Sequence, residues 1–197
     1  LGVGKSGHIA QKISSTLSST GSPSYFIHAT EALHGDIGVI SKNDSVLIFS
    51  HSGESKEIID LIPSLKNIGC KIFSFTGPTE STIAKSTDIN ISTEVDKEAC
   101  PLDLAPTSST TAALALGDAL AIALLESRKF SPQDFAKSHP GGSLGKKLLL
   151  SLGDIMHKDD EIPIVYETDK LASGLIEMSE KALGMTAVLN DNNELVG

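Results

Sequence analysis

The sequence is poor in several residue types, and each shortage narrows what the protein can be. Its 197 residues include no tryptophan and only two cysteines, Cys70 and Cys100. Two cysteines are too few for a disulfide-stapled secreted domain, and the apolar neighbours of Cys70 predict a buried, unpaired thiol. No stretch has the layout of a signal peptide. These features favour the reducing cytoplasm.

Positive charge is also scarce, because 16 lysines and arginines stand against 25 acidic residues and leave a net charge of −9. Binding to nucleic acid or to an anionic membrane surface needs a basic field, so neither partner is expected. A small anionic substrate is still compatible, since a few local groups can override the global sign. The most apolar stretch, 112–125, contains Gly117 and Asp118 and is shorter than the ~20 residues of a membrane span. It predicts a buried helix instead.

Short apolar segments alternate with amphipathic ones over the first 130 residues. In 56–67, Ile58, Ile62 and Leu65 fall on one helical face, and Gly69 is a typical helix end. Alternation of this kind predicts an α/β fold of βαβ units, with helices on both faces of a parallel sheet. We expect strands at 25–28, 46–50, 71–76 and 89–92, and helices at 7–17, 56–67 and 108–127.

The pattern changes near residue 150, where we predict a boundary between a domain at 1–150 and a partial one at 151–197. The second part is too short to be a stable domain alone. The chain opens directly on a glycine-rich turn, and the strand-like segment 187–189 has no partner after it. We therefore expect an internal piece of a longer protein.

Residues 2–7, Gly-Val-Gly-Lys-Ser-Gly, are the first candidate ligand segment. Glycines allow the backbone to approach a ligand, the following helix offers free N–H groups, and Lys5 adds positive charge. A Walker A motif would need a further glycine upstream, and the sequence shows no second nucleotide signature, so an NTPase is disfavoured. A plain tight turn with a surface lysine is the alternative.

Two hydroxyl-rich segments precede helices and form a candidate anion cradle. The first follows a strand, and carboxyl ends of parallel strands are where ligands bind in open α/β sheets. Hydroxyls beside a helix N-terminus can donate to phosphate oxygens, and the helix dipole favours the anion. Simple serine capping is the alternative for either segment. The candidate residues are Ser50, Ser52 and Ser55 in the first segment, and Thr107, Ser108, Ser109 and Thr110 in the second.

The acidic residues and histidines do not indicate a site when each is considered alone. Glu57 lies in the first turn of the helix after the serine segment and can reach the same site. Glu98, His34, His139 and His28 taken singly are typical of solvated or packed side chains. No metal-binding spacing such as HExxH is present.

Together these segments resemble the SIS (sugar isomerase) family, and more closely its D-arabinose 5-phosphate isomerases. The serine segment is shared by all SIS proteins, whereas Lys-Glu-Ala-Cys-Pro and Ser-His-Pro-Gly-Gly are specific to this branch. The start at Asp154-Ile155-Met156 resembles a CBS module. The matching stretches are 4–8, 34–36, 52–58, 97–101, 104–111 and 135–142.

The resemblance implies a flavodoxin-like three-layer αβα fold with a parallel sheet, followed by an incomplete CBS segment. It implies interconversion of D-ribulose 5-phosphate and D-arabinose 5-phosphate for the Kdo sugar of lipopolysaccharide, with no cofactor required. The implied enzyme is a homotetramer whose sites borrow residues from neighbouring subunits. By the same resemblance Lys5, Glu57, Glu98 and His139 are catalytic, Gly21, Ser22 and His34 contact substrate, and His28 binds an inhibitory zinc.

The implied reaction moves a proton between C1 and C2 through an enediolate. A carboxylate buried enough to raise its pKa is a suitable base, so we expect Glu98 or Glu57 to shuttle the proton. Lys5 is expected to steady the oxyanion, and His139 to move hydroxyl protons. Two alternatives stay open: another SIS isomerase, such as a phosphoheptose isomerase, or a phosphosugar sensor of the SIS regulator type.

Overall fold

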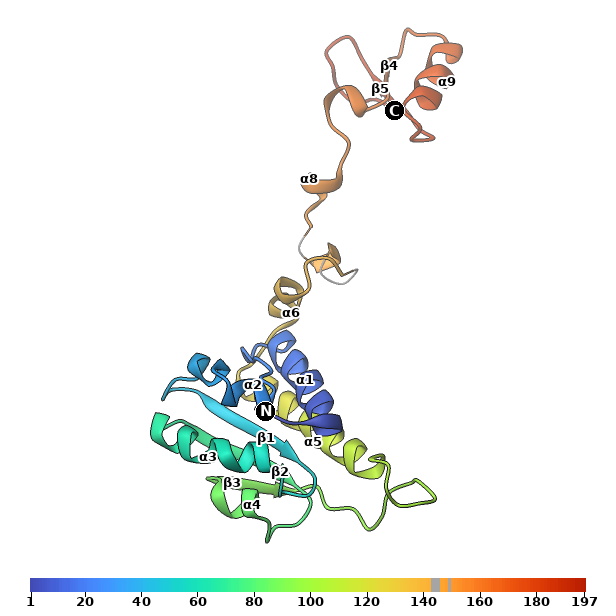
Figure 1. The fold of residues 1–197 in the computed structure, drawn as a ribbon. Coiled ribbons are helices and arrows are strands. Elements are labelled where there is room, and N and C mark those ends of the chain that lie inside the picture. Colours follow the sequence, from blue (N-terminus) through green and yellow to red (C-terminus); the bar gives the residue numbers. More distant parts are fainter. Residues whose placement is uncertain (143–145, 149) are drawn as a thin grey trace. The chain divides into compact units, whose positions relative to one another are not determined.

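The computed structural model describes residues 1–142, 146–148 and 150–197 (Figure 1). The chain divides into two compact units, Leu1–Leu148 and Leu149–Gly197. The assignment of the second unit to a partial CBS domain stays a prediction.

The first unit is built on a parallel sheet of three strands, β1 (Ser45–Ser50), β2 (Lys71–Thr76) and β3 (Ile89–Ser92), in the order β1-β2-β3. Ser45 pairs with Lys71 and Ser50 with Thr76, so β1 and β2 end level with each other. Gly2 adds single parallel bridges to Phe49 on one side and to His28 on the other. The predicted α/β class with a parallel sheet is confirmed.

Helices cover both faces of this sheet, and the strand side chains alternate between them as the pleat requires. Val46 and Ile48 pack with α2 (Ala29–Leu33), α3 (Lys56–Ile68) and α4 (Thr82–Ser86). Phe49 and Phe75 pack with α1 (Gly4–Ser19) and α5 (Ser108–Ser127) on the opposite face (Figure 1). The unit therefore has three layers.

The helix α3 follows its sequence signals closely. Ile58, Leu61, Ile62 and Leu65 are buried at helical spacing. Gly69 ends the helix in the left-handed conformation, with a φ of 82° and N–H bonds to the last turn. Elements of this kind form where local spacing and tertiary burial agree.

The prediction of a strand at 25–28 is wrong. Only His28 pairs with a neighbouring segment, through one bridge to Gly2. On the neighbouring segment Gly2 alone takes part in the pairing, and α1 begins two residues later at Gly4. A ladder needs several consecutive pairs, so the segment runs extended without becoming a strand.

The expectation that residues 112–125 form a buried helix is only half right. The helix α5 forms with the predicted bounds, but only Ser109, Gly117 and Ala121 are buried along it. Among the residues that the structure describes, α5 is the one helix long and apolar enough to cross a membrane by length and composition. Core helices of α/β folds pass the same test. The helix packs against α1, and Asp118 forms an ion pair with Lys12 there.

The remaining elements are short. In the first unit, η1 (Asp36–Val39) follows α2, and α6 (Pro132–Ser138) begins with a capping box between Ser131 and Asp134. The second unit contains α8 (Leu152–Ile155), η2 (Asp159–Glu161), β4 (Ile164–Tyr166), α9 (Leu171–Glu180) and β5 (Ala187–Leu189). The strands β4 and β5 pair in parallel.

Two glycines let the first residues approach the start of α1. A Cβ placed on Gly2 would lie 2.9 Å from the Cα of Gly7, which is backbone and cannot move aside. We expect Gly2→Ala to lower the free energy of unfolding by about 1–3 kcal/mol, as overpacking against backbone does. Urea denaturation measures this. Gly38→Ala is the matched control, because nothing lies within 4 Å of its added Cβ, and equal effects of the two variants would contradict the prediction.

Candidate active site

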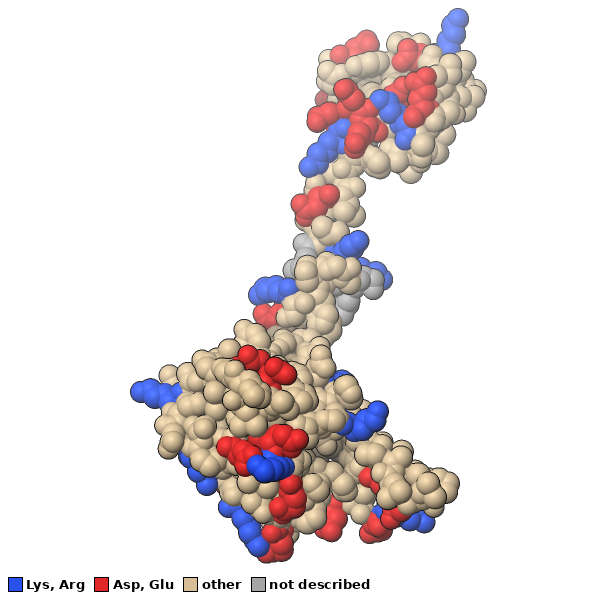
Figure 2. Space-filling model, in the orientation of Figure 1, with Lys and Arg blue, Asp and Glu red and all other residues tan. Residues whose placement is uncertain are grey.

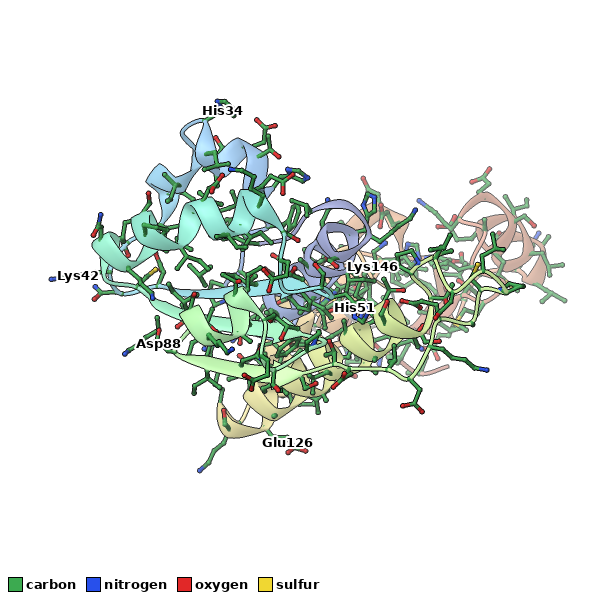
Figure 3. The ribbon with its side chains drawn as sticks, turned by 60° about the horizontal axis from the view of Figure 1, so that its bottom comes forward. His34, Lys42, His51, Asp88, Glu126 and Lys146 are labelled. Carbon is green, nitrogen blue, oxygen red and sulfur yellow. The ribbon has the colours of Figure 1, made fainter. Side chains whose placement is uncertain are left out.

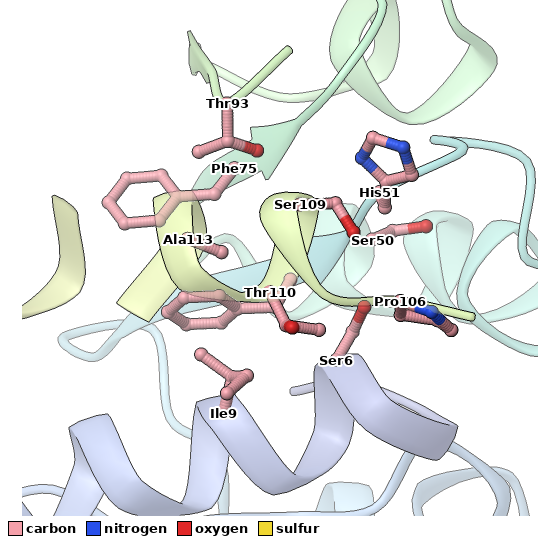
Figure 4. Close-up of a pocket in the computed structure, with 11 residues that line it drawn as sticks. Ser6, Ile9, Ser50, His51, Phe75, Thr93, Pro106, Ser109, Thr110 and Ala113 are labelled. Atoms are coloured by element: carbon pink, nitrogen blue, oxygen red, sulfur yellow. The ribbon is translucent and has the colours of Figure 1, made fainter. Parts of the chain in front are cut away.

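A pocket lies at the carboxyl ends of β1 and β2, where α1 and α5 begin (Figure 4). Ser50 and Ser109 are almost fully buried beside it, with 3% and 2% of their surface exposed. This is the edge of a parallel sheet at which α/β proteins bind ligands. The lining residues are Ser6, Ile9, Phe49, Ser50, His51, Phe75, Thr93, Pro106, Ser109, Thr110 and Ala113.

The serine loop, residues 50–55, leads from β1 into α3. The hydroxyls of Ser50 and Ser55 are 2.9 Å apart and share a hydrogen bond, and the Ser52 hydroxyl accepts from the N–H of Glu54 at 3.2 Å. Ser55 is the N-cap of α3 and makes no side-chain cap bond to it. The first N–H groups of a helix have no intrahelical partner. The loop can therefore present hydroxyl and N–H donors to an anion.

The start of α4 holds this loop in place. The Ile83 N–H donates to the carbonyl of Gly53 at 3.0 Å, and the Thr82 N–H donates to the Glu54 carboxylate at 2.7 Å. The second bond lowers the pKa of Glu54. Gly53 has a φ of 66°, and a Cβ there would lie 2.0 Å from the Ser81 Oγ. Only glycine fits this position.

The second predicted donor segment, at the start of α5, is occupied by Glu98. One carboxylate oxygen accepts from the Thr107 N–H at 2.7 Å, the Thr107 hydroxyl at 3.0 Å and the Ser109 N–H at 3.2 Å. The other accepts from the Ser109 hydroxyl. Ser109 and Thr110 line the pocket, so Glu98 lies beside it.

The electrostatics of Glu98 run against the expectation of a carboxyl with a raised pKa. Its bonds from the Ser109 hydroxyl and the Thr107 N–H lower its pKa from an ordinary 4.5 to about 2. Hydrogen bonding to the charged form outweighs desolvation here. A lowered pKa means that the stabilisation is present above pH 4.5 and is lost as the pH falls through about 2. As placed here, Glu98 caps α5, and its role as the base stays a prediction.

Lys5 and Glu57 lie near the pocket but do not line it. Lys5 is exposed in the first turn of α1, next to the pocket-lining Ser6. Glu57 is exposed in the first turn of α3, just after the serine loop. Their catalytic roles stay predictions. Ser108, exposed in part at the first position of α5, is placed similarly.

Gly21 and Ser22 lie at the opposite end of the first unit. They follow α1, whose 16 residues span about 24 Å from the pocket-lining end. The Arg128 guanidinium donates to the Gly21 carbonyl at 2.6 Å, which places both residues near the far end of α5. The Ser22 hydroxyl is buried without a hydrogen-bond partner among the described residues. Within one chain these residues cannot reach a ligand held by the serine loop.

The histidines are also dispersed. His139 follows α6, beyond the far end of α5, where its ring stacks on Phe135 with centroids 3.9 Å apart. His34 is exposed at the end of α2, apart from His51 (Figure 3). The His28 Nδ1 accepts from the Thr30 N–H at 3.3 Å as the cap of α2. The described residues contain no cluster of three or more His, Cys, Asp or Glu side chains that could hold a metal, and the zinc at His28 stays a prediction.

His51 is a pocket residue that the sequence reasoning did not select. Its carbonyl accepts from the Gly77 N–H at 2.8 Å, and its ring packs where a Cβ on Gly77 would lie, with Nδ1 at 3.1 Å. The available signal was its place directly after the strand β1. Ser6 and Thr93 also line the pocket and were not predicted, because each lies outside the two hydroxyl-rich segments.

Charge on the face of the molecule shown in Figure 2 is mixed rather than basic. Figure 2 shows acidic and basic side chains interspersed on the face in view. This fits the net charge of −9 and a ligand held by local donors instead of a broad positive field.

A family model described as the SIS domain matches residues 1–123. The chain belongs to the SIS domain family. This confirms the family predicted from the matching stretches taken together, and it agrees with a pocket at the carboxyl edge of the sheet.

Two curated relatives indicate the branch of the SIS family to which the chain is similar. The arabinose 5-phosphate isomerases KdsD of Pseudomonas aeruginosa and of Escherichia coli K12 are each 53% identical to the chain over 197 residues. The match covers 100% of this SIS-domain chain, which spans 60% of the length of those relatives. The structure of E. coli CFT073 c3406 in complex with arabinose 5-phosphate has 49% sequence identity and a TM-score of 0.69, and the match covers 71% of this chain and 74% of that one.

Proposed function

We propose that the protein is an aldose–ketose isomerase that interconverts D-ribulose 5-phosphate and D-arabinose 5-phosphate. The observation that carries the proposal is the pocket at the carboxyl edge of the sheet, with hydroxyls from β1 and α5 beside helix N-termini. That arrangement suits a phosphate monoester. The 53% identity to KdsD relatives supports the choice of sugar, and the neighbour with bound arabinose 5-phosphate supports a phosphosugar ligand.

The proposed chemistry needs no cofactor. A base removes a proton from C1 of the ketose, the enediolate forms, and a proton returns to C2 while O1 becomes the aldehyde oxygen. No net oxidation occurs. Lys5 is proposed to stabilise the negative oxygen, and Glu57 or Glu98 to carry the proton. Helix N-termini around the phosphate would fix the sugar in one orientation.

The dispersed residues fit a site completed by other subunits. Gly21 and Ser22 follow the far end of α1, and His139 lies beyond the far end of α5. None of them can join Lys5 within one chain. We propose a homotetramer in which they serve a neighbouring subunit's site, with His139 moving hydroxyl protons and His34 contacting substrate. The exposed apolar side chains of α5, such as Ile122 at 49% exposure, are consistent with an interface.

His28 is proposed to bind an inhibitory zinc, and residues 151–197 to begin a CBS module. We place the enzyme in the cytoplasm, where it would supply arabinose 5-phosphate for the Kdo sugar of lipopolysaccharide.

The proposal is tested by incubating the full-length protein with ribulose 5-phosphate and identifying the aldose formed. We expect arabinose 5-phosphate to accumulate to an equilibrium that is also reached from the other side. Sedoheptulose 7-phosphate serves as the comparison substrate, since a phosphoheptose isomerase would prefer it. Binding of either sugar phosphate without turnover would instead indicate a sensor.

A further inference from the structure

The imidazole ring of His139 is held in two ways by one residue, Phe135. The two rings stack with their centroids 3.9 Å apart and their planes at 15°. The His139 Nδ1 also lies 2.9 Å from the carbonyl oxygen of Phe135. Stacking fixes the plane of the imidazole, and the hydrogen bond decides which edge of the ring faces α6.

The carbonyl of Phe135 can accept this bond because α6 ends in a tightened turn. In a regular α-helix this carbonyl would accept from the N–H of residue 139. That N–H donates instead to the Ala136 carbonyl at 3.1 Å, and the next residue, Pro140, has no N–H to offer. The side chain of His139 therefore takes the place of the missing backbone donor.

The backbone on both sides of this pair is also fixed. The Gly142 N–H donates to the His139 carbonyl at 3.1 Å, and the Phe135 N–H donates to the Ser131 carbonyl at 3.0 Å. Ser131 and Asp134 form the capping box at the start of α6. The His139 ring is thus attached to a short helix whose two ends are both held by hydrogen bonds.

The bond to Phe135 determines where the His139 ring carries its hydrogen. A carbonyl oxygen can only accept, so the bonded Nδ1 must be the donor, and Nε2 of the neutral ring then carries the free electron pair. When Nε2 takes up a proton, Nδ1 still donates to the same carbonyl. The ring can therefore accept a proton at Nε2 and return it without turning.

We propose that Phe135 is the positioning residue of His139, whose carbonyl selects the Nδ1–H form and whose ring fixes the imidazole plane, so that Nε2 moves the hydroxyl protons of the sugar. The proposal rests on the proposed isomerase function, in which His139 serves a neighbouring subunit's site. A catalytic base that is oriented by a further group is a general arrangement in enzymes. Its effect falls steeply when its geometry loosens.

The competing arrangement makes His139 only a cap. Histidines near a helix C-terminus can bond the last carbonyls, and the stack on Phe135 would then be packing alone. In that case, a change at Phe135 would act on the fold and not through the imidazole. The two arrangements therefore differ in whether the effects of Phe135 and His139 on turnover are independent.

The first measurement is the position of the ring hydrogen in the full-length protein. Long-range proton–nitrogen NMR spectra of protein with isotope-labelled histidine show which ring nitrogens are protonated, and comparison with His139→Gln assigns the signals. At a pH where the ring is neutral, we expect a protonated Nδ1 and an unprotonated Nε2. A hydrogen on Nε2, or an even mixture of the two forms, overturns the proposal.

The second measurement is steady-state kinetics with ribulose 5-phosphate. Phe135→Leu removes the stack but keeps the backbone carbonyl, so we expect kcat to fall at least about tenfold while KM changes less than about twofold. Phe135→Tyr keeps an aromatic ring and should restore kcat to within about threefold of the unchanged protein. In a His139→Gln background, Phe135→Leu should cause no further loss. Additive losses, a loss confined to KM, or no loss in Phe135→Leu would overturn the positioning role.

Lys137→Ala is the matched control on the same helix, because Lys137 is exposed and bonds to Asp134. We expect its kcat to stay within about twofold of the unchanged protein. Circular dichroism shows whether Phe135→Leu folds, and the NMR measurement on the unchanged protein does not depend on that variant. An active isomerase with its hydrogen on Nε2 refutes only the positioning role. A protein with the expected ring form that makes no arabinose 5-phosphate refutes the proposed function and leaves the assignment of the ring intact.

Discussion

Glu98→Gln should slow isomerisation by about 10²–10⁴-fold, the range that loss of a general base typically costs. Glutamine has the size of glutamate and keeps one oxygen that can accept from the Thr107 and Ser109 N–H groups, so the start of α5 should stay folded. It cannot take up a proton from C1. Steady-state kinetics with ribulose 5-phosphate measures the loss, and thermal unfolding checks the fold.

The role of Glu98 is tested most directly by the exchange of the C2 hydrogen of arabinose 5-phosphate with solvent. If Glu98 carries the proton, tritium exchange at C2 should fall along with turnover in Glu98→Gln. Near-normal exchange in that variant would contradict the assignment and leave Glu57 as the candidate base. Glu94→Gln serves as a control, because Glu94 is exposed in the same loop and its side chain makes no hydrogen bond or ion pair with α5 among the described residues.

Gly53→Ala should raise the KM for the sugar phosphate at least about tenfold and lower the free energy of unfolding by about 1–3 kcal/mol. The residue has a φ of 66°, and an added Cβ would lie 2.0 Å from the Ser81 Oγ and 2.3 Å from the Ser81 Cβ. The serine loop must shift to relieve this contact, and its donors shift with it.

The kinetic and stability effects of Gly53→Ala can be separated with matched variants. Gly174→Ala, in the second unit, adds a Cβ whose nearest neighbour is at 3.9 Å, so it should leave KM unchanged. Adding Ser81→Gly to Gly53→Ala removes the contact but not the backbone strain, so part of the affinity should return. A KM for Gly53→Ala within twofold of the unchanged protein would show that the loop does not hold the phosphate.

Elements governed by local pattern were predictable from the sequence. The helix α3 has buried residues at helical spacing and a terminal glycine, and its bounds differ from the prediction by one residue. The extended segment 25–28 forms one bridge instead of a strand, because pairing depends on the neighbouring segment, which the local sequence does not show. Burial of α5 was overestimated, since composition does not say which helix faces have a partner.

The sequence also predicted part of the site. Ser50 and Ser109 follow from the rule that ligands meet the carboxyl ends of strands and helix N-termini. The capping of α5 by Glu98 could not be foreseen, because it depends on the path of an irregular loop between β3 and α5. The separation of Gly21 and His139 from Lys5 likewise becomes visible only when helix lengths are laid out in space.

The proposed isomerase transfers a proton between C1 and C2 of a pentose phosphate through an enediolate. The most direct test of this transfer is to equilibrate ribulose 5-phosphate with the full-length protein in deuterium oxide and to examine the aldose by NMR. We predict arabinose 5-phosphate that carries deuterium at C2. Arabinose 5-phosphate without deuterium at C2 after many turnovers, or no arabinose 5-phosphate at all, would contradict the account.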